Sequence, residues 1–300
     1  MKIGEFKELS NLLNIKLEFN YDLKKKNWFN IGGKAKVYFK VDTLKDLIFF
    51  LKKIDDKEKK FIIGAGSNIL ITDEIYDGII IKLGKSFSNI SLLPNGMIVA
   101  GASVLDKKVS EFALENGIGG FEFLFCIPGT VGGGLRMNAG CFNREFKDIL
   151  ISVQALDKNG KVVTIPAKNI LFDYRDSNLP RDLIFLSATF QGQKKDKTII
   201  KNEMNNLKSE REKSQPTRIK TSGSTFKNPI NQTDKKVWQL IKDSVPKNLS
   251  FGDACISEKH SNFFINKKNA SFKDMKKLID FVQNSVKKKT GIKLEMEIKI

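Results

Sequence analysis

The 300-residue sequence lacks an apolar run of the roughly 18 residues that a membrane-spanning helix requires. Its most apolar stretch, LIFFL at Leu47–Leu51, is followed at once by lysines. Glu5 and Glu8 lie where a secretory signal keeps a continuous apolar region, and no small-residue cleavage site follows. We therefore exclude a transmembrane protein and expect a cytoplasmic location with no membrane partner.

Cysteine and histidine are also scarce. The three cysteines, Cys126, Cys141 and Cys255, are far apart and never form a CxxC pair, so the sequence indicates neither a disulfide framework nor a cysteine-based zinc site. The single histidine, His260, excludes a histidine-rich metal cage. We expect no metal site.

Arginine is rare in a strongly basic chain. Lys and Arg total 52 against 34 Asp and Glu, a formal net charge of +18, yet only six of the 52 are arginine. Proteins that read nucleic acids use arginine for bidentate contacts and combine it with stacking aromatics. The lysines here are dispersed in twos and threes. This pattern favours a solvated lysine surface over a nucleic-acid partner, and it indicates no obligate protein partner.

The rest of the composition, 41% hydrophobic and 10% aromatic residues, is that of a globular protein of about two domains. Hydrophobic periodicity predicts alternating strands and helices in the first half of the chain. The predicted strands are 37–41, 60–64, 78–83 and 97–101; the predicted helices are 44–54, capped by Asp42 or Thr43, and one capped by Ser103 that ends at Glu115. A hairpin is predicted where 153–156 and 162–165 flank the DKNG turn.

The last third of the chain has its own pattern. A charged helix is predicted over 194–214, with a domain boundary near Pro216. Ser271 and Asp274 form a capping signal for an amphipathic helix that ends at Gly291. Residues 292–300 then alternate between apolar and charged side chains, which predicts a half-buried strand with two carboxylates on its polar face.

Two glycine clusters are candidate ligand sites. GAGSNILITD, residues 64–73, follows an apolar strand, and its glycines would let backbone N–H groups close on an anion. It matches neither the Rossmann nor the Walker fingerprint, so a plain tight turn is the stronger reading of this cluster alone. IPGTVGGGLRMNAG, residues 127–140, holds five glycines in fourteen positions. Three of them are consecutive, which favours close approach of a ligand over a flexible linker.

Two polar segments are further candidates. FDYRDSNL contains Arg175, which is either a surface charge or a planar fork that holds a carboxylate. SGSTFKNP, residues 222–229, is either a turn ended by proline or a site in which Ser224 donates a proton beside Lys227. The sequence offers no GxSxG elbow, so we do not expect a catalytic triad with His260, which we expect to be structural.

Eight motifs in order resemble the UDP-N-acetylenolpyruvoylglucosamine reductase (MurB) family. They are NWFNIGGKA, GAGSNILITD, GFEFLFCIPGTVGGGLRMNAG, FDYRDS, REKSQP, SGSTFKNP, GDACISEKHSNFFIN and LEMEI. The resemblance extends from about Asn27 to Ile298. The span from Arg175 to Pro216 is too short for the tyrosine-bearing insertion of the family's first class, so the chain is similar to the second class.

The resemblance implies an α+β protein with a p-cresol-methylhydroxylase-type FAD-binding fold. Two α/β subdomains, residues 1–84 and 85–205, would bind FAD. Residues 206–300 would form an α/β substrate domain whose last strand is a candidate to return to the FAD domain. The implied reaction is the NADPH-dependent reduction of UDP-N-acetylglucosamine enolpyruvate to UDP-N-acetylmuramate, a cytoplasmic step of peptidoglycan synthesis.

The resemblance also implies roles for individual residues. Arg175 and Glu297 would flank the enolpyruvyl carboxylate and Ser224 would be the proton donor, while Tyr174, Lys227 and Asn228 would contact the UDP-sugar substrate. The FAD-binding residues would be Gly64, Ala65, Gly66, Ser67, Asn68, Gly129, Thr130, Gly132, Gly133, Asn138 and Ala139. FAD would be the cofactor and NADPH the co-substrate.

Two alternatives remain open from the sequence. Another FAD-dependent oxidoreductase of the same superfamily would bind FAD without the SGSTFKNP and LEMEI motifs. A lysine-rich nucleic-acid-binding protein would lack the glycine clusters and show a steep dependence of affinity on salt.

Overall fold

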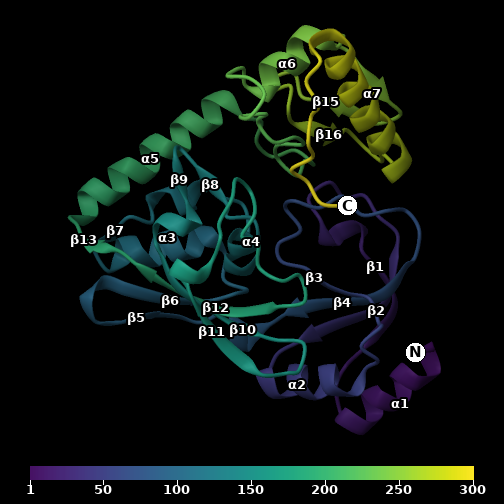
Figure 1. Cartoon of the computed structure of the whole chain (residues 1–300), viewed down its shortest axis with the longest axis vertical. Helices are drawn as coiled ribbons and strands as arrows, with labels where there is room; N and C mark the ends of the chain where they lie inside the picture. Colours follow the sequence, from purple (N-terminus) through teal and green to yellow (C-terminus); the bar gives the residue numbers. More distant parts are fainter. The chain divides into compact units, whose positions relative to one another are not determined.

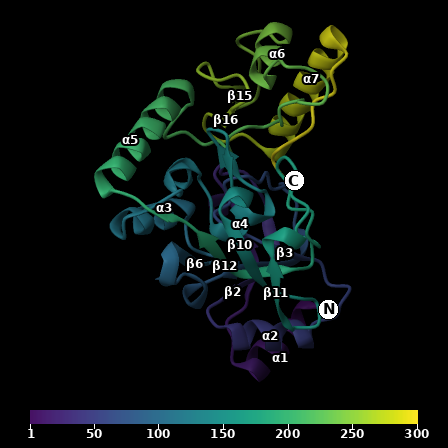
Figure 2. The same cartoon turned by 60° about the vertical axis from the view of Figure 1, so that its left-hand side comes forward.

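The computed structural model describes residues 1–300 and divides the chain into two compact units (Figures 1 and 2). Unit 1 consists of Met1–Phe19, Lys36–Ala65 and Gly78–Arg211, and unit 2 consists of Asn20–Ala35, Gly66–Asp77 and Glu212–Ile300. Each unit has its own cluster of buried apolar side chains. None of the helices is both long and apolar enough to span a membrane.

The first sheet has the strand order β1-β2-β4-β3. Its strands are β1 (Glu18–Asp22), β2 (Lys34–Val41), β3 (Lys60–Ile62) and β4 (Tyr76–Leu83), and β3 pairs parallel with β4. Helices α1 (Ile3–Leu13) and α2 (Leu44–Lys53) lie side by side in both views (Figures 1 and 2). Phe50 of α2 contacts Phe39 of β2, with ring centroids 4.6 Å apart. Helix α2 begins as predicted, because the Asp46 N–H donates to the Thr43 hydroxyl.

The second sheet lies within unit 1 and is antiparallel throughout. Its order is β11 (Val162–Pro166), β10 (Leu150–Leu156), β12 (Ile184–Gln191), β6 (Met97–Gly101) and β5 (Ile90–Leu92). The predicted DKNG hairpin is confirmed as β10–β11, and Gly160 in its turn has a φ of +75°. Two short ladders join β7 (Ile118–Gly119) to β13 (Gln193–Lys194), and β8 (Gly140–Cys141) to β9 (Arg144–Glu145).

Helices α3 (Asp106–Glu115) and α4 (Val131–Arg136) belong to unit 1, and α5 (Lys197–Ser214) ends just beyond it. The core of this unit includes a group of phenylalanines in which Phe190 contacts both Phe121 and Phe146 edge to face. The short 3-10 helices are η1 (Lys24–Lys26), η2 (Lys85–Phe87), η3 (Pro94–Gly96), η4 (Glu122–Cys126), η5 (Phe146–Asp148) and η6 (Ala167–Asn169).

Unit 2 contains α6 (Val237–Ser244), α7 (Phe272–Thr290) and the antiparallel sheet β14 (Ser250–Phe251), β15 (Ala254–Ile256), β16 (Phe264–Asn266). Helices α6 and α7 lie side by side (Figures 1 and 2). Helix α7 has the predicted ends: the Ser271 side chain accepts from the Asp274 N–H, and Gly291 adopts the left-handed conformation with a φ of +76°. Its predicted apolar stripe is buried, at Met275, Leu278, Ile279, Val282 and Val286.

Two sequence predictions about local structure are wrong. Ser103 does not cap α3, which begins three residues later; its hydroxyl donates to the carbonyl of Gly84 at 3.1 Å instead. Residues 292–300 form no regular strand, because their partners are two loops and not strands. Met296 pairs with Phe226, and Lys299 pairs with Ile69, each through an isolated bridge.

The α+β class is confirmed by the mixture of helices with mainly antiparallel sheets. The boundary expected near Pro216 lies close to the start of the last part of unit 2 at Glu212. The division into three domains at residues 84 and 205 remains a prediction.

Candidate active site

Gly64, the first residue of the first glycine cluster, meets the second cluster within unit 1. A Cβ atom added to Gly64 would lie 2.7 Å from the Thr130 hydroxyl oxygen, closer than real Cβ contacts allow. A Cβ on Gly133 would contact only this same hydroxyl, at 3.7 Å. Packing against Thr130 therefore excludes a side chain at Gly64, whereas Gly133 leaves its backbone open to a ligand that approaches the main chain.

The three consecutive glycines have different reasons to be glycine. A Cβ on Gly134 would lie 2.3 Å from the Phe146 ring, and one on Gly132 would lie 3.2 Å from Ala102. Packing therefore excludes a side chain at Gly134 and leaves little room at Gly132, which corrects the expectation that the run of three glycines serves close approach of a ligand. Only Gly133 keeps open space that a ligand could use.

The backbone of the second cluster is held by the segment before α3. The N–H groups of Val131 and Gly132 donate to the carbonyls of Val104 and Ala102, and the Asp106 N–H donates to the Gly129 carbonyl. These bonds fix the loop and the start of α4 in one conformation. A rigid loop of this kind lowers the entropic cost of ligand binding.

Asn138 joins three segments of unit 1. Its side chain is fully buried, and its amide donates to Glu145 Oε2 at 3.0 Å and to the Asp173 carbonyl at 3.1 Å. Its amide oxygen accepts from the Lys147 N–H at 3.1 Å. The backbone N–H groups of Asn138 and Ala139 also have partners within the protein, the carbonyls of Leu135 and Gly134.

The hairpin after Asn138 contains two left-handed residues, Phe142 and Asn143, with φ values of 52° and 59°. This geometry is that of a type I′ turn joining β8 and β9, in which asparagine is favoured. The Cys141 thiol donates to the Phe123 carbonyl, and burial raises the pKa of Cys141 to about 12. The thiol is therefore not a nucleophile at neutral pH.

Arg175 lies in a strained turn. Asp173 and Asp176 exchange both backbone hydrogen bonds, so Tyr174 and Arg175 are the two central residues. Arg175 has a φ of +61°, the left-handed conformation that glycine or asparagine usually occupies at this position. Its guanidinium donates to the Gly140 carbonyl at 3.0 Å and lies 4.9 Å from the centre of the Tyr174 ring. Strain of this kind persists where the surroundings impose it, commonly at functional sites.

Arg136 holds the Arg175 loop and was missed in the sequence. Its guanidinium donates to the carbonyls of Leu179, Pro180 and Leu183, at 2.8–2.9 Å, and lies 4.2 Å from the centre of the Phe185 ring. Burial is the largest cause that lowers its pKa, to about 10, so it stays charged at neutral pH. Its rarity, as one of six arginines, is the only signal in the sequence that singles it out.

The segments that carry Ser224 and Glu297 lie side by side within unit 2. The Glu297 N–H donates to the carbonyl of Thr225 at 2.9 Å, and the next pair along, Phe226 and Met296, forms an antiparallel bridge. Ser224 and Glu297 are both half-buried. The structure thus places SGSTFKNP and LEMEI side by side.

The two expected substrate contacts after Ser224 have partners within the protein. Lys227 forms an ion pair with Glu295, with Nζ and Oε1 3.0 Å apart. The Asn228 amide oxygen accepts from the N–H of Val237, the first residue of α6. Glu295 is 74% exposed and Glu297 is half-buried, so the two carboxylates that sequence spacing could not distinguish have different surroundings.

Asn262, which sequence reasoning also missed, fixes the SGSTFKNP segment. Its buried side chain accepts from the Phe226 N–H at 3.0 Å and donates to the Phe226 carbonyl at 2.9 Å. His260 lies two residues earlier, in edge contact with Phe263, and burial lowers its pKa. Its surroundings agree with the structural role expected of it.

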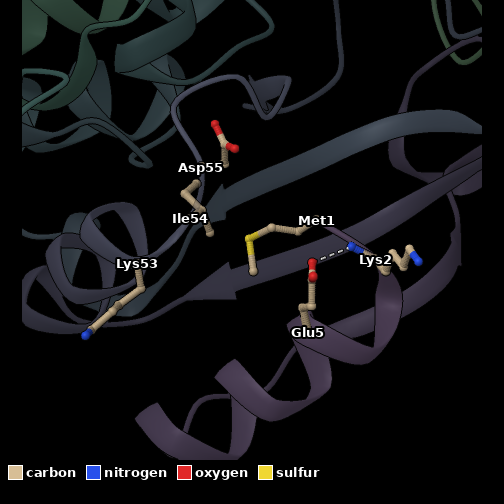
Figure 3. Close-up of a pocket in the computed structure, with 6 residues that line it drawn as sticks. All are labelled: Met1, Lys2, Glu5, Lys53, Ile54 and Asp55. Atoms are coloured by element: carbon tan, nitrogen blue, oxygen red, sulfur yellow. Dashed lines mark hydrogen bonds between the residues drawn. The ribbon is translucent and has the colours of Figure 1, made fainter.

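A pocket of about 780 Å³ lies elsewhere, at the start of α1 and the end of α2 (Figure 3). Met1, Lys2, Glu5, Lys53, Ile54 and Asp55 line it. The hydrogen bond drawn there joins the Lys2 N–H to Glu5 at the start of α1. None of the predicted site residues lines this pocket.

The residues of unit 1 fit a dinucleotide cofactor. Gly64 and Gly133 face the Thr130 hydroxyl, and the loop that carries Gly133 is held by hydrogen bonds to residues 102–106. Such glycine-rich backbone binds a pyrophosphate through N–H groups. The other residues of the first cluster, from Gly66 to Asn68, belong to unit 2.

Family models match most of the chain. The model for the UDP-N-acetylenolpyruvoylglucosamine reductase C-terminal domain matches residues 215–300, and the FAD binding domain model matches residues 35–166. These matches include the SGSTFKNP and LEMEI motifs in one domain and both meeting glycine segments in the other. They support the FAD-binding fold that the resemblance implies.

Curated and solved relatives span the full chain. A UDP-N-acetylenolpyruvoylglucosamine reductase of Pelagibacter ubique is 67% identical over 300 residues, which are 100% of this chain and 99% of the relative. One of Rickettsia bellii is 44% identical over 291 residues, covering 96% and 95% of the two chains. The crystal structure of the reductase from Thermus caldophilus superimposes with a TM-score of 0.81 at 30% identity and covers 95% of this chain and 98% of that one.

Proposed function

Because the chain belongs to the UDP-N-acetylenolpyruvoylglucosamine reductase family, we propose that it reduces UDP-N-acetylglucosamine enolpyruvate to UDP-N-acetylmuramate with NADPH as the co-substrate. Family membership makes it a flavin-dependent oxidoreductase of peptidoglycan synthesis, and the match of the FAD binding domain supports FAD as its cofactor. The identity of the nicotinamide donor and the cytoplasmic location are parts of the proposal.

The glycine segments of unit 1 hold the FAD pyrophosphate in this proposal. Gly133 offers open backbone beside the Thr130 hydroxyl, and Gly64 packs directly against that hydroxyl. FAD, when bound, supplies the chemistry that takes a hydride from NADPH and gives it to the vinyl group of the substrate. The protein contributes binding, orientation and charge.

Arg175 binds the enolpyruvyl carboxylate. When the vinyl methylene accepts a hydride, negative charge develops on the neighbouring carbon and spreads toward this carboxylate. A guanidinium already held by Gly140 and Tyr174 needs little reorganisation to stabilise that charge. Arg136 keeps the turn in place, and its role is to position Arg175.

Ser224 donates the proton, and Glu297 stabilises the developing charge as a polarising or protonated acid. The observation that carries this part of the proposal is the hydrogen bond from Glu297 to the carbonyl of Thr225, which brings the two half-buried side chains onto adjacent segments. The Ser224 hydroxyl supplies its proton to the carbon that carries the carboxylate, which completes the addition across the double bond.

A different FAD-dependent oxidoreductase is the alternative enzyme. It would have no reason to place a serine and a carboxylate together in unit 2, and the family model that matches residues 215–300 supports the reductase over it. The lysine-rich nucleic-acid-binding alternative does not account for the rigid glycine loop.

Ser224→Ala tests the proposal by separating the two half-reactions. Flavin reduction by NADPH should stay close to the parental rate, because the hydroxyl acts only on the substrate carbon. Reoxidation by the enolpyruvyl sugar should slow by about 10²–10⁴-fold, the usual contribution of general acid catalysis. Stopped-flow absorbance follows each half-reaction separately.

Thr225→Val is the matched control, since it removes a neighbouring buried hydroxyl that has no hydrogen-bond partner. It should leave both rates near those of the parent. Reoxidation of the Ser224→Ala variant at the parental rate would show that Ser224 is not the proton donor.

A further inference from the structure

The backbone of Glu297 is held by Asn68, a residue from a distant part of the chain. Glu297 lies in a segment without regular strand structure, so the position of its carboxylate depends on individual contacts and not on a sheet. Its N–H donates to Thr225, and its carbonyl accepts from the side chain amide of Asn68 at 3.1 Å. Asn68 lies 229 residues earlier in the chain, in the glycine cluster GAGSN.

The backbone of Asn68 adds a second contact. Its carbonyl accepts from the Lys299 N–H at 3.0 Å, and the Leu70 N–H donates to the Lys299 carbonyl at 2.8 Å. Asn68 therefore bonds to both sides of Ile298, whose side chain is buried. Glu297 is fixed between SGSTFKNP on one side and GAGSN on the other.

The Asn68 loop is itself tightly placed. Gly66 is left-handed with a φ of +69°, and a Cβ added there would lie 2.1 Å from the Lys26 carbonyl oxygen. The Gly66 carbonyl accepts from the Trp28 N–H at 3.0 Å. These contacts fix the backbone two residues before Asn68, so its side chain is presented to Glu297 without much freedom.

We propose that Asn68 is a positioning residue that acts on the reduction of the enolpyruvyl substrate through Glu297, in addition to any contact of its loop with FAD. This inference rests on the proposed function. A side chain amide suits the task because it supplies a donor to a carbonyl, whereas an aspartate at this site would place a carboxylate against that carbonyl.

Asn68→Ala and the isosteric Asn68→Asp test the inference in the FAD-loaded enzyme. Reoxidation of reduced enzyme by the enolpyruvyl sugar should slow by roughly 3- to 10-fold in Asn68→Ala, the value of one neutral hydrogen bond, and by more in Asn68→Asp. The loss should lie in kcat with little change in KM. In FAD-saturated enzyme, flavin reduction by NADPH should stay within about twofold of the parent, since this half-reaction does not use Glu297.

A double-mutant cycle provides the decisive readout. Because Asn68 acts through the Glu297 carboxyl, Asn68→Ala should cause no further loss in a Glu297→Gln background. Full additivity of the two losses would overturn the inference, and so would an equal loss of FAD affinity and of both half-reactions, which would make Asn68 a flavin-binding residue only.

Ser222→Ala is the matched control. The Ser222 hydroxyl donates to the carbonyl of Ile69 at 3.2 Å, so the variant loses a hydrogen bond to the same loop without touching Glu297. It should retain the parental rate of reoxidation. A loss in Ser222→Ala equal to that in Asn68→Ala would reduce the effect to general loosening of the loop and contradict the inference.

Hydrogen exchange separates this inference from the proposed function. The amides of residues 294–300 should exchange faster in Asn68→Ala than in the parent, whether or not the enolpyruvyl sugar is the substrate. Unchanged exchange would refute the positioning contact itself. Failure of the parent enzyme to reduce the enolpyruvyl sugar would refute only the proposed function.

Discussion

Replacement of Arg175 by glycine separates the strain of its backbone from the role of its guanidinium. Arg175 has a φ of +61°, which costs a residue with a side chain about 1–2 kcal/mol relative to glycine. Glycine also gives the unfolded chain more freedom, which costs about 0.5–1 kcal/mol. The balance predicts that Arg175→Gly is more stable than Arg175→Ala by up to about 1.5 kcal/mol.

The comparison uses alanine because both variants lose the same contacts. Each one removes the guanidinium that donates to Gly140 and lies over Tyr174. The loss of these interactions therefore cancels between the two variants, and the backbone term remains. Both variants should lose reduction of the enolpyruvyl sugar while they keep FAD, which would show that the strained conformation serves the side chain.

Urea unfolding of both variants provides the assay, and Arg181 provides the control. Arg181 is exposed, pairs with Asp176 and is not left-handed. At Arg181 the order should therefore reverse, with the glycine variant less stable than the alanine variant by about 0.5–1 kcal/mol. The strain argument is refuted if Arg175→Ala proves more stable than Arg175→Gly, which is the order expected at Arg181.

Three further predictions concern carboxylates and a hydroxyl. Glu297→Gln should depress enolpyruvyl reduction far more than Glu295→Gln, because Glu295 is exposed and paired with a lysine; equal losses in steady-state assays would contradict the assigned role. Burial raises the pKa of Asp106 well above its usual value, so the folded state keeps a proton that the unfolded state releases above about pH 4. The parent should therefore lose stability relative to Asp106→Asn as pH rises through the folded-state pKa of Asp106, as measured by urea titrations from about pH 5 to pH 9. A difference in the free energy of unfolding that does not change with pH would contradict this. Thr225→Val should lower the free energy of unfolding by less than about 1 kcal/mol or raise it, because the buried hydroxyl has no partner; a larger loss in the same titrations would mean that the hydroxyl is bonded.

Local structure could be predicted where the sequence encodes it locally. The apolar stripe and both ends of α7 depend on residues within a few turns of one another, and the hairpin β10–β11 depends on four turn residues. The cap of α3 could not be found in this way, because Ser103 is used by the distant carbonyl of Gly84. The sequence near a helix start does not reveal whether a serine hydroxyl will bond to an N–H of that helix or to a carbonyl from a distant part of the chain.

The proposed site residues were predicted by motif, and the residues that hold their segments in place were not. Arg136 and Asn262 hold the Arg175 and Ser224 segments through carbonyls and N–H groups that any residue could offer. No spacing rule links Asn68 to Glu297 across 229 residues. In the run of three glycines, the sequence led us to predict a ligand contact where there is a packing contact. Gly134 has no room for a side chain because the Phe146 ring lies against it.

An anaerobic visible spectrum of the purified protein tests the central claim most directly. The account predicts bound FAD, bleaching of its absorbance by NADPH, and recovery of the absorbance when UDP-N-acetylglucosamine enolpyruvate is added. A protein that takes up no FAD, or whose reduced flavin is not reoxidised by the enolpyruvyl sugar, would contradict it.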